Sequence, residues 1–502
     1  MKMFLFNHDF RYAAEQILLT MFPDERPEYP EGKPEGDRAE LSLNEGCKYF
    51  TAVCRLVLGG QEYYGRSATA KSKITDDITR ARYLQRIVKL SFYRAALNSG
   101  KEKPVWGSLT GIRPGKLMSN LLETGMSDKA ALSKFIRDND VSPERAKLCL
   151  HTAHAGLNCA KSLEEDDICL YVGIPFCPTR CSYCSFVSQS VQKSMKLIPE
   201  YLDALYREID ATAKTVNELK LRPIAVYMGG GTPTTLSSGQ LDELCSRLES
   251  AFDLSSVREY TVEAGRPDTI AADKLKVLKL HGVTRVSVNP QTMDDAVLSA
   301  IGRKHTAQDV LDALYIVRSV GGFDINMDLI AGLPLDTPES FGKTLNTVLK
   351  LAPENITVHT LSLKKGSGIT LGDTPRPSAE DVRKMLDCAS DALYSAQYEP
   401  YYLYRQKYMS GGFENVGWQR EHRENIYNIC IMEELCSIIS MGGGASTKLC
   451  VGNGRIERLF DPKYPLEYIQ GIDKIVSEKA RIKEILSYNA NSRLISYNAQ
   501  EV

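Results

Sequence analysis

Short apolar, β-branched runs alternate with longer amphipathic stretches over the middle of the chain. Such runs are typical of buried strands, and the stretches between them carry apolar residues at helical spacing. The predicted strands cover 168–174, 224–230, 259–264, 285–290, 325–332 and 356–361. The predicted helices lie near 198–219, 239–252, 271–280, 294–301, 307–320 and 338–350. This alternation predicts βα units with parallel strands.

Six such units are too few to close an eight-stranded barrel. The predicted fold class is therefore α/β, with a partial (β/α)6 barrel that stays open on one side. Ligands of such folds bind at the carboxyl ends of the strands. Polar residues at those ends are thus the candidates for chemistry.

The pattern changes on both sides of this region. Residues 1–162 predict an α+β domain, in which the expected strands cover 1–7, 39–44 and 48–58 and the main helices cover 12–21 and 76–97. Residues 364–502 predict a mostly helical region that covers the open side of the barrel and the active site. We therefore expect three domains, with boundaries at 1–162, 163–363 and 364–502.

Composition narrows the range of partners. The 502 residues include 62 Lys and Arg and 63 Asp and Glu, for a formal net charge of −1, and the basic residues are spread along the chain. Nucleic acid is therefore not an expected partner, and an anionic ligand must be met by a local pocket. The sequence contains neither a signal-peptide pattern nor the ~18 apolar residues of a membrane span, so the expected location is the cytoplasm. Its 13 cysteines are then expected to be thiols or metal ligands rather than disulfides.

One local cluster of cysteines follows the first predicted strand directly, in the pattern Cys177-x3-Cys181-x2-Cys184. Thiolates at this spacing can bind one face of a 4Fe–4S cluster and leave the fourth iron open to the amino and carboxylate groups of an amino acid. Structural zinc would need a fourth Cys or His ligand, and the next such residue along the chain is Cys245. The remaining alternative is a set of ordinary buried cysteines.

Polar residues and glycines also stand at the ends of the later strands. Gly229–Thr232 follows the second strand, where glycines let a ligand approach the backbone. Glu263 and Gln291 stand at the next two strand ends, and Asp328 lies in an apolar strand, where a carboxylate is costly unless it is paired or bound. Arg303 has a guanidinium fork that suits a carboxylate. The alternative for the glycine run is a plain turn, and the alternative for Asp328 is an Asp that caps a helix. The alternative for Arg303 is a solvent-facing residue at a helix end.

The stretch YVGIPFCPTRCSYC, residues 171–184, resembles the cluster loop of radical S-adenosylmethionine (SAM) enzymes. It is most similar to the oxygen-independent coproporphyrinogen III oxidase family, in its HemZ-like branch. The resemblance covers residues 169–362 strongly and reaches weakly to about 450. It implies two cofactors, SAM and a 4Fe–4S cluster held by Cys177, Cys181 and Cys184. The cofactor contacts that it implies are Tyr171, Tyr183, Gly230, Gly231, Thr232, Glu263, Gln291, Arg303, Asp328, Ile330 and Ser362.

The resemblance also implies a role for each contact. Glu263 and the glycine motif would meet the SAM amino group, and Arg303 would meet its carboxylate. Gln291 and Asp328 would bind the ribose. Ile330 and Ser362 would border the adenine, and Tyr171 and Tyr183 would border the cluster and SAM. Aromatic residues near a first barrel strand are more often core residues, which is the alternative for both tyrosines.

The activity implied by the family is oxidative decarboxylation of coproporphyrinogen III to protoporphyrinogen IX in haem biosynthesis. The implied partners are a tetrapyrrole substrate and an external electron donor and acceptor, and no acid or base catalyst is assigned. Residues 441–446 resemble the family's glycine-rich loop that helps close the site, with a packing turn as the alternative. Gly173 stands where studied members have a His, and Ser185–Phe186 where they have Gly-Cys. These departures weaken the expectation of decarboxylase activity. Because related family members bind haem rather than process its precursor, the alternative function is a haem-binding chaperone or another radical SAM protein that modifies a tetrapyrrole.

Overall fold

The computed structural model describes residues 1–111, 113–184, 189–190, 195–362, 375–406, 412–452 and 455–498. Ser185 and Phe186 lie outside the described residues. Contacts divide the chain into two units, one of residues 1–150 with 405–413 and one of residues 151–404 with 414–502. The three domains expected from the sequence stay a prediction.

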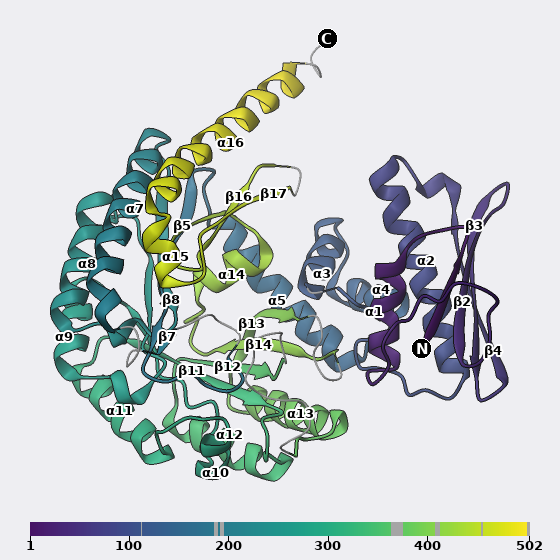
Figure 1. Ribbon diagram of the computed structural model, residues 1–502, viewed down its shortest axis with the longest axis horizontal. Coiled ribbons are helices and arrows are strands. Elements are labelled where there is room, and N and C mark those ends of the chain that lie inside the picture. The colour runs from purple at the N-terminus through teal and green to yellow at the C-terminus, as the bar shows by residue number, and fades with distance from the viewer. Residues whose placement is uncertain are drawn as a thin grey trace. The chain divides into compact units, whose positions relative to one another are not determined.

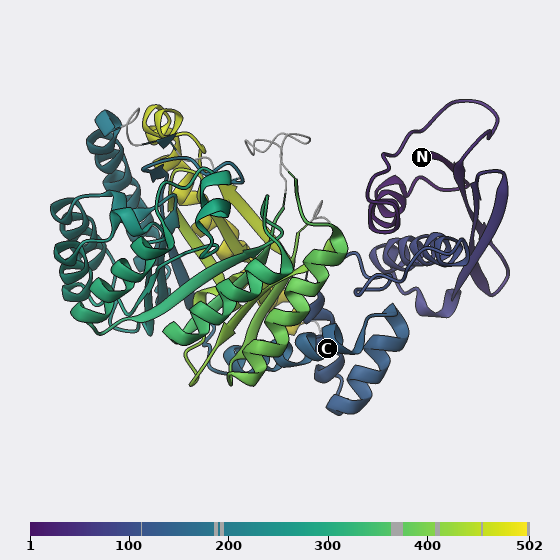
Figure 2. The same cartoon turned by 90° about the horizontal axis from the view of Figure 1, so that it is seen from below.

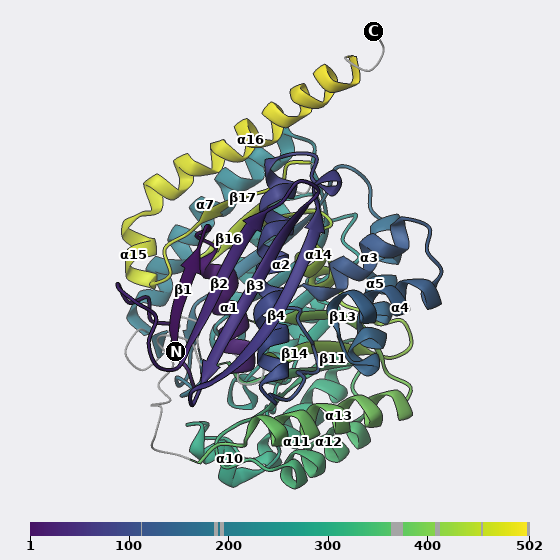
Figure 3. The ribbon, with the colours of Figure 1, turned by 90° about the vertical axis from the view of Figure 1, so that its right-hand side faces the viewer.

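The first unit is built on a four-stranded sheet in the order β1-β2-β3-β4. Its strands are β1 (Lys2–Phe6), β2 (Arg38–Glu45), β3 (Tyr49–Leu58) and β4 (Gln61–Ala70). β1 runs parallel to β2 and the other neighbours are antiparallel. Two helices, α1 (Arg11–Met21) and α2 (Asp77–Asn98), cover one face of this sheet (Figure 3). The predicted strands and helices are confirmed, and β4 is an additional strand.

Three further helices follow in the chain: α3 (Pro114–Glu123), α4 (Asp128–Asn139) and α5 (Pro143–Lys161). The last of them continues into the second unit. None of the described helices combines the length and the apolar character that a membrane crossing requires.

The second unit contains an eleven-stranded sheet in the order β13-β14-β12-β11-β10-β9-β8-β5-β15-β16-β17. Six neighbouring strands at its centre are parallel. They are β5 (Asp167–Ile174), β8 (Arg222–Gly230), β9 (Glu259–Glu263), β10 (Arg285–Ser287), β11 (Asp324–Ala331) and β12 (Asn355–Thr360). All six predicted strands are therefore confirmed, and they are buried because helices pack outside them (Figure 1).

The helices between these strands also match the prediction. They are α7 (Ile198–Glu218), α8 (Ser238–Ala251), α9 (Ala272–Leu280), α10 (Asp295–Ala300), α11 (Ala307–Val320) and α12 (Pro338–Leu351). Ser237, Thr306 and Thr337 form capping boxes at the starts of α8, α11 and α12. Each box satisfies backbone N–H groups that a helix start leaves without partners. Local sequence thus sets where these helices begin.

The C-terminal part has the expected helices, α13 (Ala379–Ser395), α14 (Ile426–Glu433), α15 (Pro465–Gln470) and α16 (Ile472–Asn498). It also adds five strands that the sequence analysis did not predict: β13 (Glu399–Arg405), β14 (Glu414–Gln419), β15 (Ser437–Gly442), β16 (Ser446–Cys450) and β17 (Ile456–Phe460). β14 pairs antiparallel with β12, and β15 pairs parallel with β5. The C-terminal part therefore extends the sheet on both sides, while α13 packs beside α12 and the β11–β12 side of the sheet (Figure 2).

Candidate active site

The three cysteines of the cluster loop follow the carboxyl end of β5. Cys177 ends the short strand β6 (Phe176–Cys177), which pairs with β7 (Gln189–Ser190), and its Sγ lies 3.5 Å from Oγ1 of Thr232. Cys181 is buried, and the guanidinium of Arg266 donates to its Sγ at 3.7 Å. The positive charge of Arg266 therefore lies beside one of the three predicted cluster ligands.

The glycine motif after β8 lies directly against the start of the cluster loop. The amide of Gly231 donates to the carbonyl of Ile174 at 2.8 Å, and the amide of Thr232 donates to the carbonyl of Phe176 at 2.7 Å. A Cβ atom at position 231 would lie 2.5 Å from the Phe176 carbonyl oxygen, and Gly230 has φ of +106°. Only glycine fits this close approach, so the motif positions the loop that carries Cys177.

Arg303 is buried and follows α10. Its guanidinium donates to the carbonyl of Asn289 at 2.8 Å and to the hydroxyl of Tyr183 at 3.1 Å. Its Nε is buried and has no hydrogen-bond partner among the described residues. A buried guanidinium with a spare donor is suited to an anionic ligand beside the cluster loop.

Glu263 ends β9 and accepts a hydrogen bond of 2.6 Å from the hydroxyl of Tyr227. Burial raises the pKa of Glu263 to about 7, and the negative charge of Asp328 adds to this effect, while the Tyr227 hydrogen bond and His359 oppose it. Such a carboxyl group can exchange its proton for an ammonium partner near neutral pH.

Asp328 lies on β11 and contacts the side chains of Asn326 and His359. Its Oδ1 accepts from Asn326 at 2.8 Å, and its Oδ2 lies 3.7 Å from Nε2 of His359. Burial alone would raise the pKa of Asp328, but its contacts with His359, Asn326 and Thr357 hold it below its ordinary value. Asp328 therefore stays ionised and can accept hydrogen bonds from hydroxyl groups.

The ends of β10 and β11 are joined through Gln291. This residue has φ of +66°, its amide donates to the carbonyl of Asp328 at 2.9 Å, and its carbonyl accepts from Ile330 at 3.0 Å. Side-chain oxygen Oδ1 of Asn289 also accepts from the Asp328 amide at 3.2 Å. These bonds bring Gln291, Asp328 and Ile330 to the same edge of the sheet.

Ile330 belongs to an apolar cluster that includes Leu298, and Tyr183 and Leu361 pack against that cluster. The next residue, Ser362, has a buried Oγ without a hydrogen-bond partner among the described residues. An apolar patch beside an unsatisfied hydroxyl is compatible with a flat ring that carries polar edges.

Tyr171 lies on β5 in a stack of three tyrosines. Its ring centroid is 6.3 Å from that of Tyr227 and 6.2 Å from that of Tyr427, and the last two are 4.4 Å apart. Tyr227 is the donor to Glu263, so Tyr171 is linked to the site through this stack. Its expected contact with the cluster and SAM stays a prediction.

The glycine-rich run 441–446 contains the end of β15 and the turn to β16. Gly442 pairs with Gly173, and a Cβ atom at position 442 would lie 2.4 Å from the Gly173 carbonyl oxygen. The hydroxyl of Tyr201 donates to the Gly173 carbonyl at 2.6 Å and accepts from the Gly443 amide at 2.7 Å. The run is therefore held beside the strand that leads into the cluster loop, and its expected role in closing the site stays a prediction.

Comparison with known proteins supplies the family. Residues 171–348 match the family model of the radical SAM superfamily. The chain is 38% identical over 385 residues to the oxygen-independent coproporphyrinogen-III oxidase-like protein HemZ of Bacillus subtilis (strain 168), which covers 76% of this chain and 77% of that protein. This chain belongs to that radical SAM family. The α/β radical SAM fold class expected from the sequence is thereby confirmed.

Two further similarities span less of the chain. The heme chaperone HemW of Bacillus subtilis (strain 168) is 38% identical over 192 residues, which is 38% of this chain and 49% of that protein. Coproporphyrinogen III oxidase (HemN) from Escherichia coli aligns with 25% identity and a TM-score of 0.49, over 64% of this chain and 72% of that structure. Radical SAM proteins use a 4Fe–4S cluster and SAM, and these are the cofactors of this chain.

The residues of this radical SAM protein fit its cofactors in charge and in hydrogen-bonding capacity. Arg303 offers a guanidinium with a spare N–H, and Glu263 offers a partly buried carboxyl group with a pKa of about 7. SAM carries a carboxylate and an ammonium group, which are complementary to these two side chains. Arg266 and Arg303 lie close to Cys181, where a cluster with thiolate ligands adds negative charge.

Sequence reasoning missed three members of this radical SAM site, Arg266, Tyr227 and His359. Each contacts a predicted residue: Arg266 contacts Cys181, Tyr227 contacts Glu263, and His359 contacts Asp328. Tyr227 and His359 lie within strands rather than after them. Alternate residues of a strand face the same side of the sheet. Each of these two residues therefore faces the same side as a polar residue on the neighbouring strand, and this pattern in the sequence could have identified them.

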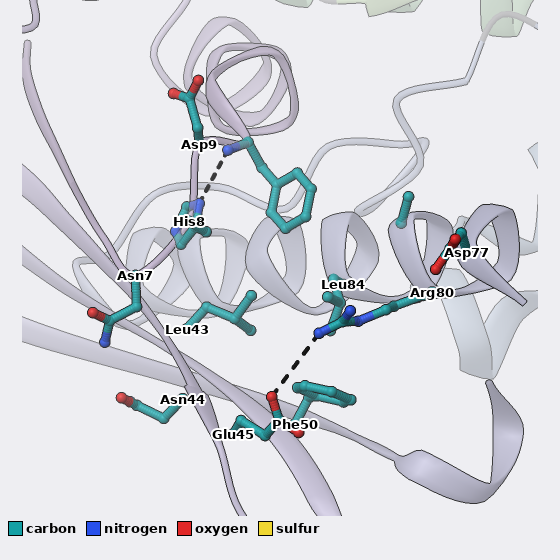
Figure 4. A pocket seen from close by; sticks show the side chains of 12 residues that line it. Asn7, His8, Asp9, Leu43, Asn44, Glu45, Phe50, Asp77, Arg80 and Leu84 are labelled. Carbon is teal, nitrogen blue, oxygen red and sulfur yellow. Dashed lines mark hydrogen bonds and ion pairs between the residues drawn. The ribbon is translucent and has the colours of Figure 1, made fainter.

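A separate cavity of about 640 Å³ lies within the first unit and is lined there by residues such as His8, Glu45, Phe50 and Arg80. Figure 4 shows Arg80 directed at Glu45, with 3.9 Å between their charged groups. No predicted cluster or SAM contact lines this cavity. It is therefore not part of the radical SAM site.

Proposed function

We propose that this radical SAM protein is a cytoplasmic oxidoreductase that decarboxylates propionate side chains of coproporphyrinogen III to give protoporphyrinogen IX in haem biosynthesis. The observation that carries the proposal is the position of Arg303 beside the cluster loop, buried and with a spare donor, in a chain 38% identical to a coproporphyrinogen-III oxidase-like protein. This arrangement supports SAM binding next to a three-cysteine cluster.

In this proposal each cofactor has named protein partners. Cys177, Cys181 and Cys184 hold the cluster, Arg303 binds the SAM carboxylate, and Glu263 binds its amino group. Gly230, Gly231 and Thr232 line the amino end of SAM from the adjacent strand. The ribose and adenine are bound by Gln291, Asp328, Ile330 and Ser362. When bound, the cluster and SAM supply hydrogen-atom abstraction, and the protein supplies binding, orientation and charge.

The chain's own groups have three tasks. Asp328 is held ionised by His359 and Asn326, so it can accept hydrogen bonds from ribose hydroxyls. Tyr227 orients Glu263 toward one side of the site through its 2.6 Å hydrogen bond. Burial of Arg303 and Gln291 keeps water away from the groups that they bind.

Each decarboxylated propionate loses one hydrogen atom from its β-carbon, one electron and carbon dioxide, which leaves a vinyl group. The tetrapyrrole therefore needs two partners besides SAM, an electron donor that reduces the cluster and an acceptor that takes the substrate electron. Neither partner needs to be part of this chain.

An anaerobic product assay tests the proposal. Reconstituted protein is incubated with SAM, a reductant and an electron acceptor, with coproporphyrinogen III in one sample and haem in a parallel one, and the products are identified by mass spectrometry. The expected result is vinyl product from coproporphyrinogen III and none from a variant with Cys177, Cys181 and Cys184 changed to Ala. Release of 5′-deoxyadenosine without porphyrinogen turnover would refute the decarboxylase.

A second candidate function, a haem-binding chaperone, is supported by the environment of Gly173. A Cβ atom there would lie 3.2 Å from the Gly443 carbonyl oxygen and 3.5 Å from the Met441 carbonyl oxygen. A glycine thus packs closely against the glycine-rich run at the position where the resemblance places a histidine in the studied oxidases. Stoichiometric haem binding, with no vinyl product in the same assay, would favour this function over the decarboxylase.

A further inference from the structure

A second group of cysteines meets inside the same unit, at the other end of the barrel strands from the cluster loop. Cys169 is near the amino end of β5, Cys430 lies in α14, and Cys436 immediately precedes β15. Their three Sγ atoms all lie within 4.8 Å of one another. Cys159, in α5, packs against this group and is partly exposed. Three thiols from three elements therefore meet at one point, and a fourth from α5 packs beside them.

The spacing of the sulfurs fits a single metal ion. The Sγ atoms of Cys169 and Cys436 are 3.7 Å apart. A tetrahedral zinc ion with Zn–S bonds of ~2.3 Å places its sulfur ligands about 3.8 Å apart. The observed distance is much longer than the ~2.05 Å of a disulfide bond. A cubane cluster binds each cysteine through a different iron, and so holds its sulfurs further apart than one ion does.

The surroundings of the four thiols are those of a closed structural site. Cys169 and Cys430 have no exposed surface, Cys436 is 8% exposed, and Cys159 at the edge of the group is partly exposed. Ile224, Ala225 and Ile438 pack around them. Four protein ligands in a mostly apolar shell are typical of structural zinc, whereas a catalytic zinc ion keeps one position open.

We propose that Cys159, Cys169, Cys430 and Cys436 bind one Zn²⁺ ion as a structural site separate from the 4Fe–4S cluster. Each thiol that binds releases its proton to solvent, and the sulfur then donates an electron pair to the metal. The site joins α14 and the start of β15 to β5, the first strand of the barrel.

The proposed zinc site is also connected to the radical SAM centre through packed tyrosine side chains. Tyr427 belongs to the apolar cluster around the thiols and stacks on Tyr227 at 4.4 Å between ring centroids. Tyr227 in turn donates to Glu263. The metal is thus a positioning element for the tyrosine stack, and it has no contact with the reacting groups.

Metal analysis tests this site independently of any activity. The chain with Cys177, Cys181 and Cys184 changed to Ala lacks the ligands of the 4Fe–4S cluster. Metal bound at that loop therefore cannot contribute to the measured zinc content. After anaerobic purification we expect about one zinc per chain by mass spectrometry, and a loss of at least tenfold when Cys169→Ala and Cys436→Ala are added. Cys245→Ala is the matched control, because Cys245 is equally buried but faces Tyr260, and its zinc content should not change.

Two results would overturn the site. One is a folded, metal-free parent chain whose remaining cysteines all titrate as thiols. The other is a disulfide between Cys169 and Cys436 in that chain, found by peptide mapping. If the double variant does not fold, Co²⁺ exchange into the parent chain decides instead: the visible absorption of tetrahedral cobalt thiolate supports the site, and its absence overturns it.

Discussion

The guanidinium of Arg303 donates a hydrogen bond of 3.1 Å to the hydroxyl of Tyr183, a residue that lies between the second and third cysteines of the cluster loop. A residue after α10 is thereby tied to the loop that follows β5. Arg303 keeps a buried Nε without a partner among the described residues. The same side chain thus positions the loop and offers a donor to an anionic group.

Arg303→Lys is expected to weaken SAM binding. Lysine keeps the positive charge but lacks the several N–H groups of a guanidinium, which can donate to Tyr183 and to a carboxylate at the same time. Loss of one charged hydrogen bond costs about 1.5–3 kcal/mol, or roughly 10- to 150-fold in Kd. Calorimetric titration of the reconstituted protein with SAM measures this change, with Arg318→Lys as the control on exposed α11. Equal affinities of the two variants at equal iron content would contradict the role of Arg303.

SAM affinity is also expected to depend on pH through Glu263. Burial raises the pKa of this carboxyl group to about 7, and only its ionised form attracts the ammonium group of SAM. As pH falls through 7 the group takes up a proton, so binding should be roughly tenfold weaker at pH 6 than at pH 8. In Glu263→Gln the affinity should be low and should vary little with pH over this range.

Tyr227→Phe provides the complementary test of Glu263. The tyrosine hydroxyl stabilises the ionised carboxylate, so its removal raises the pKa of Glu263 further. The midpoint of the pH profile for SAM binding should therefore move upward while the affinity at high pH changes less. A profile that keeps its midpoint would show that Glu263 does not control the titration.

Gly231→Ala is expected to disturb the cluster loop. The added Cβ would lie 2.5 Å from the carbonyl oxygen and 2.8 Å from the amide nitrogen of Phe176, and backbone atoms cannot move aside cheaply. We expect a loss of about 1–3 kcal/mol in the free energy of unfolding, as for other overpacked sites, and a lower iron content after reconstitution. Gly239→Ala is the control, because its Cβ would meet no atom within 4 Å.

The alternation of apolar runs and amphipathic stretches predicts the six central parallel strands, because helices that follow them in the chain bury them. β15 was not predicted, although its sequence SIISMG is apolar, because its partner β5 is distant in the chain and the run is short. Cys430 and Cys436 were missed for a related reason. Neither forms a metal-ligand pattern until folding brings α14 next to β5.

Within the site, the spacing of the cysteines and the positions of polar residues at strand ends predict which types of side chain are present. They do not predict which of these side chains contact one another. Arg303 was expected to be a ligand for a carboxylate, and its bond to Tyr183 depends on how the loop turns after Cys181. Arg266 contacts Cys181 although nothing in the sequence distinguishes it from the other arginines. Side-chain partners across strands depend on register, which local pattern does not determine.

Lys479→Met is expected to destabilise the chain strongly. Lys479 on α16 lies 2.5 Å from Glu208 on α7, and both side chains are almost fully buried. Removing the lysine leaves a buried charge without compensation, which costs about 3–5 kcal/mol. Because Glu208 also accepts from the Gly442 amide, the change should loosen the glycine-rich run. Urea unfolding measures it, and the exposed Lys483→Met should have a much smaller effect.

Transfer of deuterium tests the proposed decarboxylation most directly. Coproporphyrinogen III labelled with deuterium at the β-carbons of its propionates is incubated anaerobically with the reconstituted protein, SAM, a reductant and an electron acceptor. The proposed reaction predicts 5′-deoxyadenosine that carries one deuterium, together with vinyl product in matching amount. Unlabelled 5′-deoxyadenosine, with the propionates intact, would contradict it.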